Sequence, residues 1–227
     1  ETLSFDPENT EALNNKGIVL RDLERNQEAI ACYDRIIELK PENNYAWHNR
    51  AHNLSNLGRQ EEALASYDKA TECDPSSAST WHNRGIVLQK LERNEEAIAS
   101  YEKTLEFAPN DNEARYKKAL LLEKLERYDA AISIYDYLIS LKPAYYLTWY
   151  QKGIALQKSG DYEAAISNYD KALELKPDLY NAWQKRGDAL AALGREEEAI
   201  ASRKKATEGT ITFYPDGSVV ADGKRVL

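Results

Sequence analysis

Six prolines recur along this chain at one fixed interval, and that spacing constrains the fold more than any other feature. They stand at Pro7, Pro41, Pro75, Pro109, Pro143 and Pro177, each 34 residues after the one before. Proline cannot continue an α-helix and marks the step after a helix ends. A fixed period of this length indicates a stack of helical repeats.

Aligning the chain on these prolines gives six units of similar sequence. The units cover residues 10–43, 44–77, 78–111, 112–145, 146–179 and 180–209. The eleventh residue is Leu and the twentieth is Ala in every unit, while the eighth is Gly or Ala. Trp stands fourth in four units, and Tyr stands twenty-fourth in five. Small residues let two helices approach closely, and we expect both aromatic residues to fill the space that remains between them.

This pattern resembles the signature of the tetratricopeptide repeat (TPR) family, and the resemblance covers about nine-tenths of the chain. It implies an all-α solenoid, a right-handed superhelix in which each repeat contributes two amphipathic helices, A and B. One unit cannot bury its apolar faces alone, so neighbouring units stack and share a continuous core. The repeats are similar in style to those of bacterial multi-repeat proteins.

Both ends of the chain depart from the repeat. Residues 1–9 read like residues 102–110, the end of a B helix, so we expect the remnant of a preceding repeat helix. Residues 210–227 hold three short β-rich runs separated by turn signals at Gly217 and Gly223. We predict a short C-terminal β-hairpin or meander there. It is interpreted as a cap on the last repeat or the start of another domain, with a docking strand for a partner as the alternative.

Composition limits the classes of partner and compartment. The formal net charge of −8 repels nucleic acid and anionic lipid, so we expect neither nucleic acid nor a membrane as a partner. No apolar stretch is long enough to span a bilayer. Cys32 and Cys73 form no Cys-x-x-Cys pair and are interpreted as free thiols of a reducing compartment, which predicts a cytoplasmic protein.

Catalytic motifs are missing from the sequence. It has no glycine-rich phosphate loop, no Gly-x-Ser-x-Gly and no His-Glu-x-x-His. We therefore predict that this segment is no enzyme and carries no cofactor.

The A helices hold the candidate binding residues. In the TPR family these helices line a concave groove, and the sixth residue of each repeat faces it. Here the sixth residues can all donate a hydrogen bond, and they are Asn15, Asn49, Asn83, Lys117, Gln151 and Lys185. A carboxamide offers a donor and an acceptor, which matches the unpaired N–H and C=O groups of an extended peptide. The asparagine ladder resembles that of the O-GlcNAc transferase superhelix and predicts a peptide-binding groove.

Aromatic and imidazole rings face the same predicted groove. We assign to partner binding the rings of Tyr45, His48, His82, Tyr116 and Tyr150. Packing between neighbouring A helices is the alternative for the tyrosines. Together with His52, the two histidines could hold zinc or nickel, but no carboxylate or Cys completes such a shell, so we predict no metal and a polar, pH-sensitive groove floor.

Charge and residue type limit the kinds of polypeptide that the predicted groove could bind. The clamp with which some TPR proteins hold acidic chaperone tails needs Lys at the fifth position, and no repeat has one. In the family the groove is lined by the second, fifth, sixth, ninth, twelfth and thirteenth residues of each repeat. Here the charges at these positions sum to +1 while the chain carries −8, which suits a mixed or mildly acidic polypeptide. We therefore predict a protein-protein interaction scaffold. The alternatives are a module that self-associates through the solenoid ends or C-terminal strands, and the sensing arm of a larger multidomain enzyme.

Overall fold

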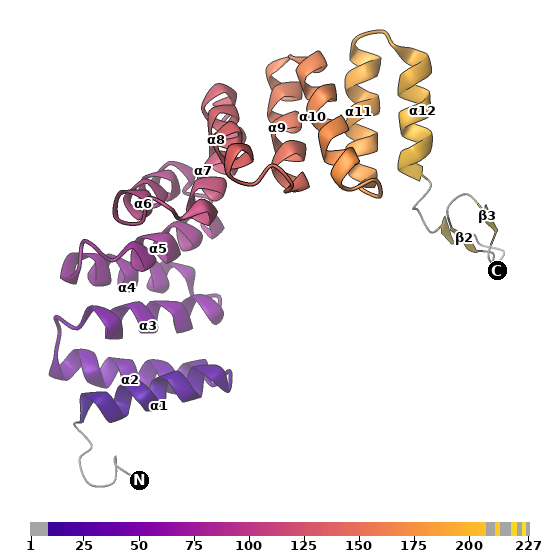
Figure 1. Cartoon of the computed structure of the whole chain (residues 1–227). Coiled ribbons are helices and arrows are strands. Elements are labelled where there is room, and N and C mark those ends of the chain that lie inside the picture. Colours follow the sequence, from indigo (N-terminus) through magenta and orange to yellow (C-terminus); the bar gives the residue numbers. More distant parts are fainter. Residues whose placement is uncertain (1–8, 208–211, 214–218, 222–223, 226–227) are drawn as a thin grey trace. The chain divides into compact units, whose positions relative to one another are not determined.

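The computed structural model of the chain describes residues 9–207, 212–213, 219–221 and 224–225. This described part forms twelve α-helices and three short β-strands (Figure 1). The helices are α1 (Thr10–Asp22), α2 (Asn26–Leu39), α3 (Asn44–Asn56), α4 (Gln60–Cys73), α5 (Ala78–Lys90), α6 (Asn94–Phe107), α7 (Asn112–Lys124), α8 (Tyr128–Leu141), α9 (Tyr146–Ser159), α10 (Tyr162–Leu175), α11 (Tyr180–Ala192) and α12 (Glu196–Thr207). The strands are β1 (Thr212–Phe213), β2 (Val219–Ala221) and β3 (Lys224–Arg225). Apart from Asn9, the repeat remnant predicted at residues 1–9 lies outside the described residues.

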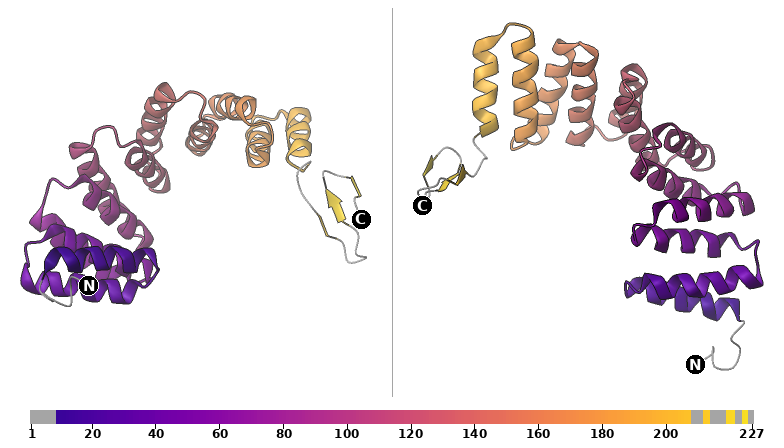
Figure 2. Two further views of the ribbon diagram at one scale, coloured as in Figure 1. Left: turned by 60° about the horizontal axis from the view of Figure 1, so that its bottom comes forward. Right: turned by 180° about the vertical axis from the view of Figure 1, so that it is seen from behind.

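The helices belong to two compact units, residues 1–118 and 119–227, and the boundary between the units lies inside α7. Each odd-numbered helix is the A helix of a repeat, and the even-numbered helix after it is the B helix. In unit 1, α2 contacts both α1 and α3, and α4 contacts both α3 and α5. Figure 2 shows the paired helices from two further directions. The all-α repeat architecture predicted from the sequence is confirmed.

A buried tyrosine fills the centre of each of the first five repeats. The tyrosines at the twenty-fourth position are at most 1% exposed, and they are Tyr33, Tyr67, Tyr101, Tyr135 and Tyr169. A Cβ placed on Gly17, Gly85 or Gly153 would lie only 2.6–2.8 Å from the ring of its own repeat's tyrosine. Glycine at the eighth position therefore lets helix A pass close over the ring, and the predicted role of both positions is confirmed.

The prediction that the fourth-position tryptophans fill the space between the helices of a repeat is wrong in part, because each of these side chains is only partly buried. Each indole Nε1 instead donates a hydrogen bond at 2.8–2.9 Å to the carbonyl of the preceding proline, in the pairs Trp47–Pro41, Trp81–Pro75, Trp149–Pro143 and Trp183–Pro177. In the fourth repeat Arg115 takes this place, and its Nη2 donates to the Pro109 carbonyl at 2.6 Å. In these five repeats the residue at this position thus ties helix A to the loop before it and stays partly exposed.

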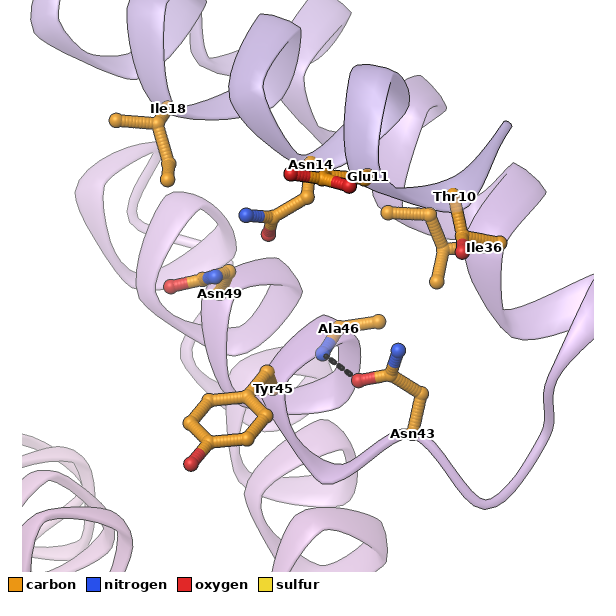
Figure 3. Close-up of a pocket in the computed structure, with 9 residues that line it drawn as sticks. All are labelled: Thr10, Glu11, Asn14, Ile18, Ile36, Asn43, Tyr45, Ala46 and Asn49. Atoms are coloured by element: carbon orange, nitrogen blue, oxygen red, sulfur yellow. Dashed lines mark hydrogen bonds between the residues drawn. The ribbon is translucent and has the colours of Figure 1, made fainter. Parts of the chain in front are cut away.

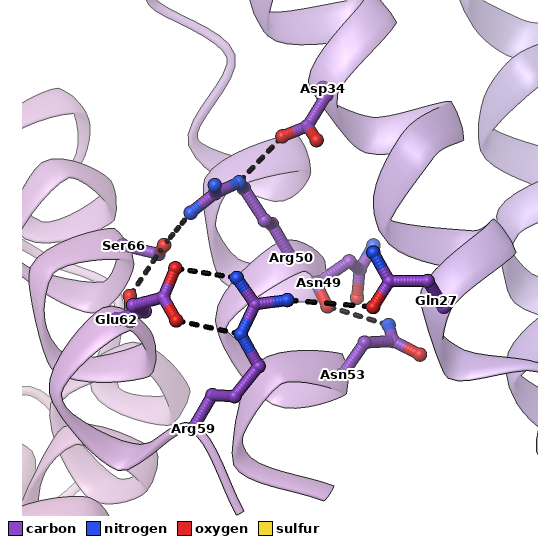
Figure 4. Close-up of polar contacts among 8 residues, drawn as sticks. All are labelled: Gln27, Asp34, Asn49, Arg50, Asn53, Arg59, Glu62 and Ser66. Atoms are coloured by element: carbon purple, nitrogen blue, oxygen red, sulfur yellow. Dashed lines mark hydrogen bonds and ion pairs between the residues drawn. The ribbon is translucent and has the colours of Figure 1, made fainter. Parts of the chain in front are cut away.

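A ladder of ion pairs, which the sequence pattern did not reveal, links successive repeats. Arg50 donates from Nε to Asp34 Oδ1 of the preceding repeat at 2.6 Å and from Nη1 to Ser66 Oγ (Figure 4). Its guanidinium lies 5.9 Å from the centre of the Trp47 ring. The same contacts recur in the pairs Arg84–Asp68 and Arg186–Asp170. The basic seventh and acidic twenty-fifth positions therefore fix how one repeat sits on the next.

The turn between helices A and B contains one residue in the left-handed region. Its φ is 58–59° at Glu24, Glu92 and Glu126, and 73–94° at Gly58, Gly160 and Gly194. A residue with a Cβ is strained in this region by about 1–2 kcal/mol, whereas glycine adopts it freely. Three of the six turns therefore store strain that glycine relieves in the others.

The three strands pair antiparallel in the order β1-β2-β3, with Thr212 opposite Val220 and Val220 opposite Arg225. They lie within the segments for which the sequence predicts extended structure. The roles suggested for residues 210–227, as a cap, another domain or a docking strand, stay predictions. Within the described residues, no helix is long and apolar enough to cross a membrane.

Candidate functional site

The side chain of Asn49 on α3 takes no part in the hydrogen bonding among the described residues. The residue is half-buried, and its backbone carbonyl accepts a hydrogen bond from Asn53 Nδ2 at 2.7 Å (Figure 4). Among the described residues, none hydrogen-bonds the Asn49 carboxamide itself. The same holds for the carboxamide of Asn15 on α1, which is exposed. A half-buried amide without a protein partner is suited to a ligand or to water.

Asn83 on α5 is oriented by a histidine of the preceding repeat. Its Nδ2 lies 3.4 Å from His48 Nε2, and His48 Nδ1 lies 3.0 Å from Thr80 Oγ1. This pattern fits a neutral imidazole that donates from Nδ1 and accepts at Nε2. Burial lowers the pKa of His48 to about 4, with a smaller effect from His52, so the ring is neutral at pH 7. The Asn83 carbonyl oxygen is then left to accept a hydrogen bond from elsewhere.

The other histidines have separate partners. His82 Nδ1 lies 3.1 Å from Asp111 Oδ2, and His52 Nδ1 lies 3.4 Å from Asn56 Nδ2. The rings of His48 and His82 each pack edge-on against the buried tyrosine of their own repeat. Within the described part of the chain, no group of three or more His, Cys, Asp or Glu side chains is placed to hold a metal ion.

A pocket opens between α1 and α3 in unit 1, with a volume of about 370 Å³ (Figure 3). Its lining consists of Thr10, Glu11, Asn14, Ile18, Ile36, Asn43, Tyr45, Ala46 and Asn49. Two of the predicted site residues, Tyr45 and Asn49, are thus brought together. Tyr45 is 72% exposed, so its ring belongs to the surface and not to the packing between helices. Asn43 is already engaged, because its Oδ1 caps α3 by accepting from the Ala46 N–H.

Lys117 and Tyr116 on α7 are both half-buried. The Lys117 ammonium lies 3.4 Å from the Glu113 carboxylate of the same helix. Lys90, a groove position of α5, donates to Ser55 Oγ on α3 at 3.1 Å. The ammonium groups of Lys117 and Lys90 therefore already have partners within the protein.

Unit 2 carries Tyr150, Gln151 and Lys185. Gln151 is half-buried and Lys185 is exposed, and among the described residues neither has a hydrogen-bonded or ion-paired partner. The Tyr150 ring lies 6.0 Å from the ring of Tyr169, and burial raises the pKa of its hydroxyl. Tyr150 thus packs on the core tyrosine of its own repeat, which lies on the B helix α10 and not on a neighbouring A helix, and its assignment to partner binding stays a prediction.

The twelfth positions, which the family pattern assigns to the groove, support the core in three repeats. The hydroxyl of Tyr101 donates to Gln89 Oε1 at 3.2 Å, and that of Tyr169 to Gln157 Oε1 at 2.7 Å. In the fourth repeat Glu123, only 8% exposed, accepts from Lys158 Nζ at 2.9 Å and faces the Tyr135 hydroxyl at 3.4 Å. The recurring separation of twelve residues from the core tyrosine is the sequence signal that could have revealed this.

Comparisons with known proteins agree with the repeat pattern. Sequence models described as tetratricopeptide repeat match residues 10–43 and 146–179, 82–146, and 180–208, and one described as TPR repeat matches residues 54–92. No curated protein sequence matches.

Several solved structures share the fold. YrrB, described as a TPR protein with an unusual peptide-binding site, is 28% identical with a TM-score of 0.67, over 77% of this chain and 90% of that one. MamA is 25% identical with a TM-score of 0.70, over 74% and 92%. A tetratricopeptide repeat protein from Parabacteroides merdae is 25% identical with a TM-score of 0.62, over 90% and 81%.

Proposed function

Since the chain belongs to the tetratricopeptide repeat family and is thereby a protein-interaction scaffold, we propose that the A-helix face of unit 1 binds an extended peptide by its backbone. Asn49 and Asn83 hold the peptide, and Asn15 and Lys117 contact it on either side along the helix order. The single observation that carries the proposal is the half-buried Asn49 carboxamide, which no described residue engages.

The two asparagines offer complementary groups. Asn49 has both its amide donor and its carbonyl acceptor free for a peptide group. Asn83 directs its amide toward His48 at 3.4 Å, so its carbonyl is the group that faces the partner as an acceptor. Neighbouring A helices lie roughly 10 Å apart and an extended chain advances about 3.3 Å per residue, so each rung meets about every third residue.

A relative supports a peptide as the ligand. YrrB is described as a TPR protein with a peptide-binding site, and it aligns with 77% of this chain at 28% identity. The exposed Tyr45 ring adds apolar contact beside Asn49, as aromatic residues do at protein interfaces. His48 and His82 form the floor of the groove, since hydrogen bonds to Thr80 and Asp111 hold their rings in place.

In unit 2, taken by itself, Gln151 and Lys185 occupy the positions that match Asn49 and Asn83. We extend the proposal to them as longer donors for a polypeptide partner. Tyr116 of α7 remains a contact residue in the proposal, whereas Tyr150 acts through its packing on Tyr169.

The test starts from peptides selected on the immobilised protein from a random library. Loss of both carboxamides in the Asn49→Ala, Asn83→Ala variant leaves peptide groups unpaired, which predicts at least tenfold weaker binding, since each unpaired group costs about 1–3 kcal/mol. Lys69→Ala on α4, whose ammonium pairs with Glu72, is the control and should bind as the native chain does. Unchanged affinity of the double variant would refute the groove, and loss of binding on deletion of residues 210–227 alone would place the site in the strands.

Self-association is the second candidate, favoured by apolar side chains left open on two helices. Val19 of α1 and Leu23, which follows the C-terminal end of α1, are 57% and 61% exposed, and Ile200 of α12 is 64% exposed. Like charges oppose a continuation of the ion-pair ladder from one copy to the next. The seventh position of the first repeat is Lys16, and the twenty-fifth position of the sixth repeat, which is acidic in the ladder pairs, is Lys204. Light scattering over a concentration series should therefore give a monomer. A concentration-dependent increase in mass would favour assembly instead.

A further inference from the structure

We infer that the pocket between α1 and α3 binds a cationic side chain of the peptide, best an arginine. This inference rests on the proposed function, since it names the side chain that the backbone clamp places beside Asn49. The pocket volume of about 370 Å³ is at the low end of the ~300–1,000 Å³ of small-molecule sites, which suits one side chain.

The pocket is open because the fifth position of the first repeat carries a short side chain. In the second repeat that position is His48, whose ring reaches Thr80 on the next A helix at 3.0 Å. In the third it is His82, which reaches Asp111 at 3.1 Å. In the first repeat it is Asn14, and no hydrogen bond to a described residue engages its carboxamide. The space that an imidazole bridges in the next two repeats is therefore left to a ligand.

The lining matches the two parts of an arginine side chain. Ile18, Ile36 and Ala46 provide an apolar surface for the stem (Figure 3). The carboxylate of Glu11 and the carboxamide oxygens of Asn14 and Asn49 provide acceptors for the guanidinium, which has five N–H donors and no acceptor. Arginine is favoured over lysine because its planar fork can reach several acceptors at once.

Charge around the pocket favours a cation over an anion. Among the described residues, no ion pair or hydrogen bond engages the exposed Glu11 carboxylate. The chain's own Lys40 approaches from the Thr10 side, where its Nζ donates to the neutral Thr10 hydroxyl at 3.2 Å. Arg21, further along α1, is neutralised by Asp22 at 2.9 Å. Glu11 is the one charged residue among those that line the pocket, and the ammonium of Lys40 lies outside the lining, beside Thr10. A guanidinium in the pocket would therefore meet a carboxylate, whereas an acidic side chain would meet a like charge.

The test compares two blocked tripeptides, acetyl-Ala-Arg-Ala-amide and its citrulline analogue, which has the same shape without the charge. Binding to the full chain is followed by the NMR signals of the Asn14 and Asn49 side-chain amides. We expect the arginine peptide to shift both and to bind about fivefold to tenfold more tightly, because hydrogen bonds to charged groups are the stronger ones. The preference should shrink as salt is added, because Glu11 is exposed.

Three variants decide the assignment. Glu11→Gln should abolish the preference for arginine, and Asn14→His, which copies the next repeat, should close the pocket and remove the shifts at Asn49. Glu72→Gln on α4, a carboxylate paired with Lys69, is the matched control and should keep the preference. Circular dichroism melts check that each variant folds.

Failure of this inference can be told from failure of the backbone clamp. If both tripeptides shift Asn49 equally, or neither shifts it, the cationic pocket is wrong. The groove then still stands or fails on the library-selected peptides and the Asn49→Ala, Asn83→Ala variant.

Discussion

The neutral, buried His48 predicts that the first three repeats lose stability in mild acid. Burial lowers the pKa of this imidazole from 6.5 to about 4 in the folded chain. Between these two values the unfolded chain binds a proton that the folded chain does not. Stability therefore falls as the pH falls below about 6.5, and the loss is complete near pH 4.

The size of the effect follows from linkage. One pKa unit corresponds to about 1.4 kcal/mol, so at pH 5 the shift removes about 2 kcal/mol of the stability present at pH 8. The geometry agrees with this direction, because a proton on Nε2 would face the Asn83 amide, which lies 3.4 Å away.

Urea titrations of the native chain and of His48→Gln between pH 8 and pH 5 measure the effect. Carboxylates also begin to titrate in this range, so the difference between the two proteins isolates the histidine. The native chain should lose about 1.5–2 kcal/mol more than the variant on going to pH 5. Equal losses in the two proteins would show that His48 is protonated freely in the fold.

Three further changes test the fold that carries the site. Glu92→Gly should stabilise the chain by about 0.5–1 kcal/mol, measured by urea titration. Glycine removes the backbone strain at φ 58°, and this gain exceeds the added entropy of the unfolded chain. Gly58→Ala should destabilise the chain for the same reason. Gly85→Ala should cost about 1–3 kcal/mol, because the new Cβ would lie 2.8 Å from the Tyr101 ring; no loss in a thermal melt would mean that the ring moves freely. Trp81→Ala should cost roughly 2–3 kcal/mol, less than a fully buried aromatic, and a neutral result would show that its bond to Pro75 contributes nothing.

The sequence predicted the repeat architecture because the residues that carry it recur in one register. Tyr101, for example, recurs with a small residue at the eighth position, Gly85 in its own repeat, because the ring lies close under helix A there. The partly exposed position of Trp81 could not be predicted in the same way. A tryptophan that packs one face and donates to a carbonyl shows the same periodicity as one buried on both faces.

The candidate site was predicted less completely, because it depends on side-chain directions. The sequence placed Asn49 and Asn83 on the A helices, but it could not show that His48 engages one of them and not the other. Nor could it show that Asn14 leaves a pocket, since that follows from the length of the side chain across the gap. Periodicity fixes which face a residue is on, whereas contacts between repeats fix what it can bind.

A double-mutant cycle between Asn49 and the peptide backbone tests the proposed clamp most directly. Each amide of a library-selected peptide is replaced in turn by an ester, which removes one N–H donor, and binding is measured to the native chain and to Asn49→Ala. If Asn49 clamps the backbone, one ester position should cost about 1–3 kcal/mol with the native chain and almost nothing with the variant. If every ester weakens binding equally in the two proteins, Asn49 does not hold the peptide backbone and the proposed clamp is wrong.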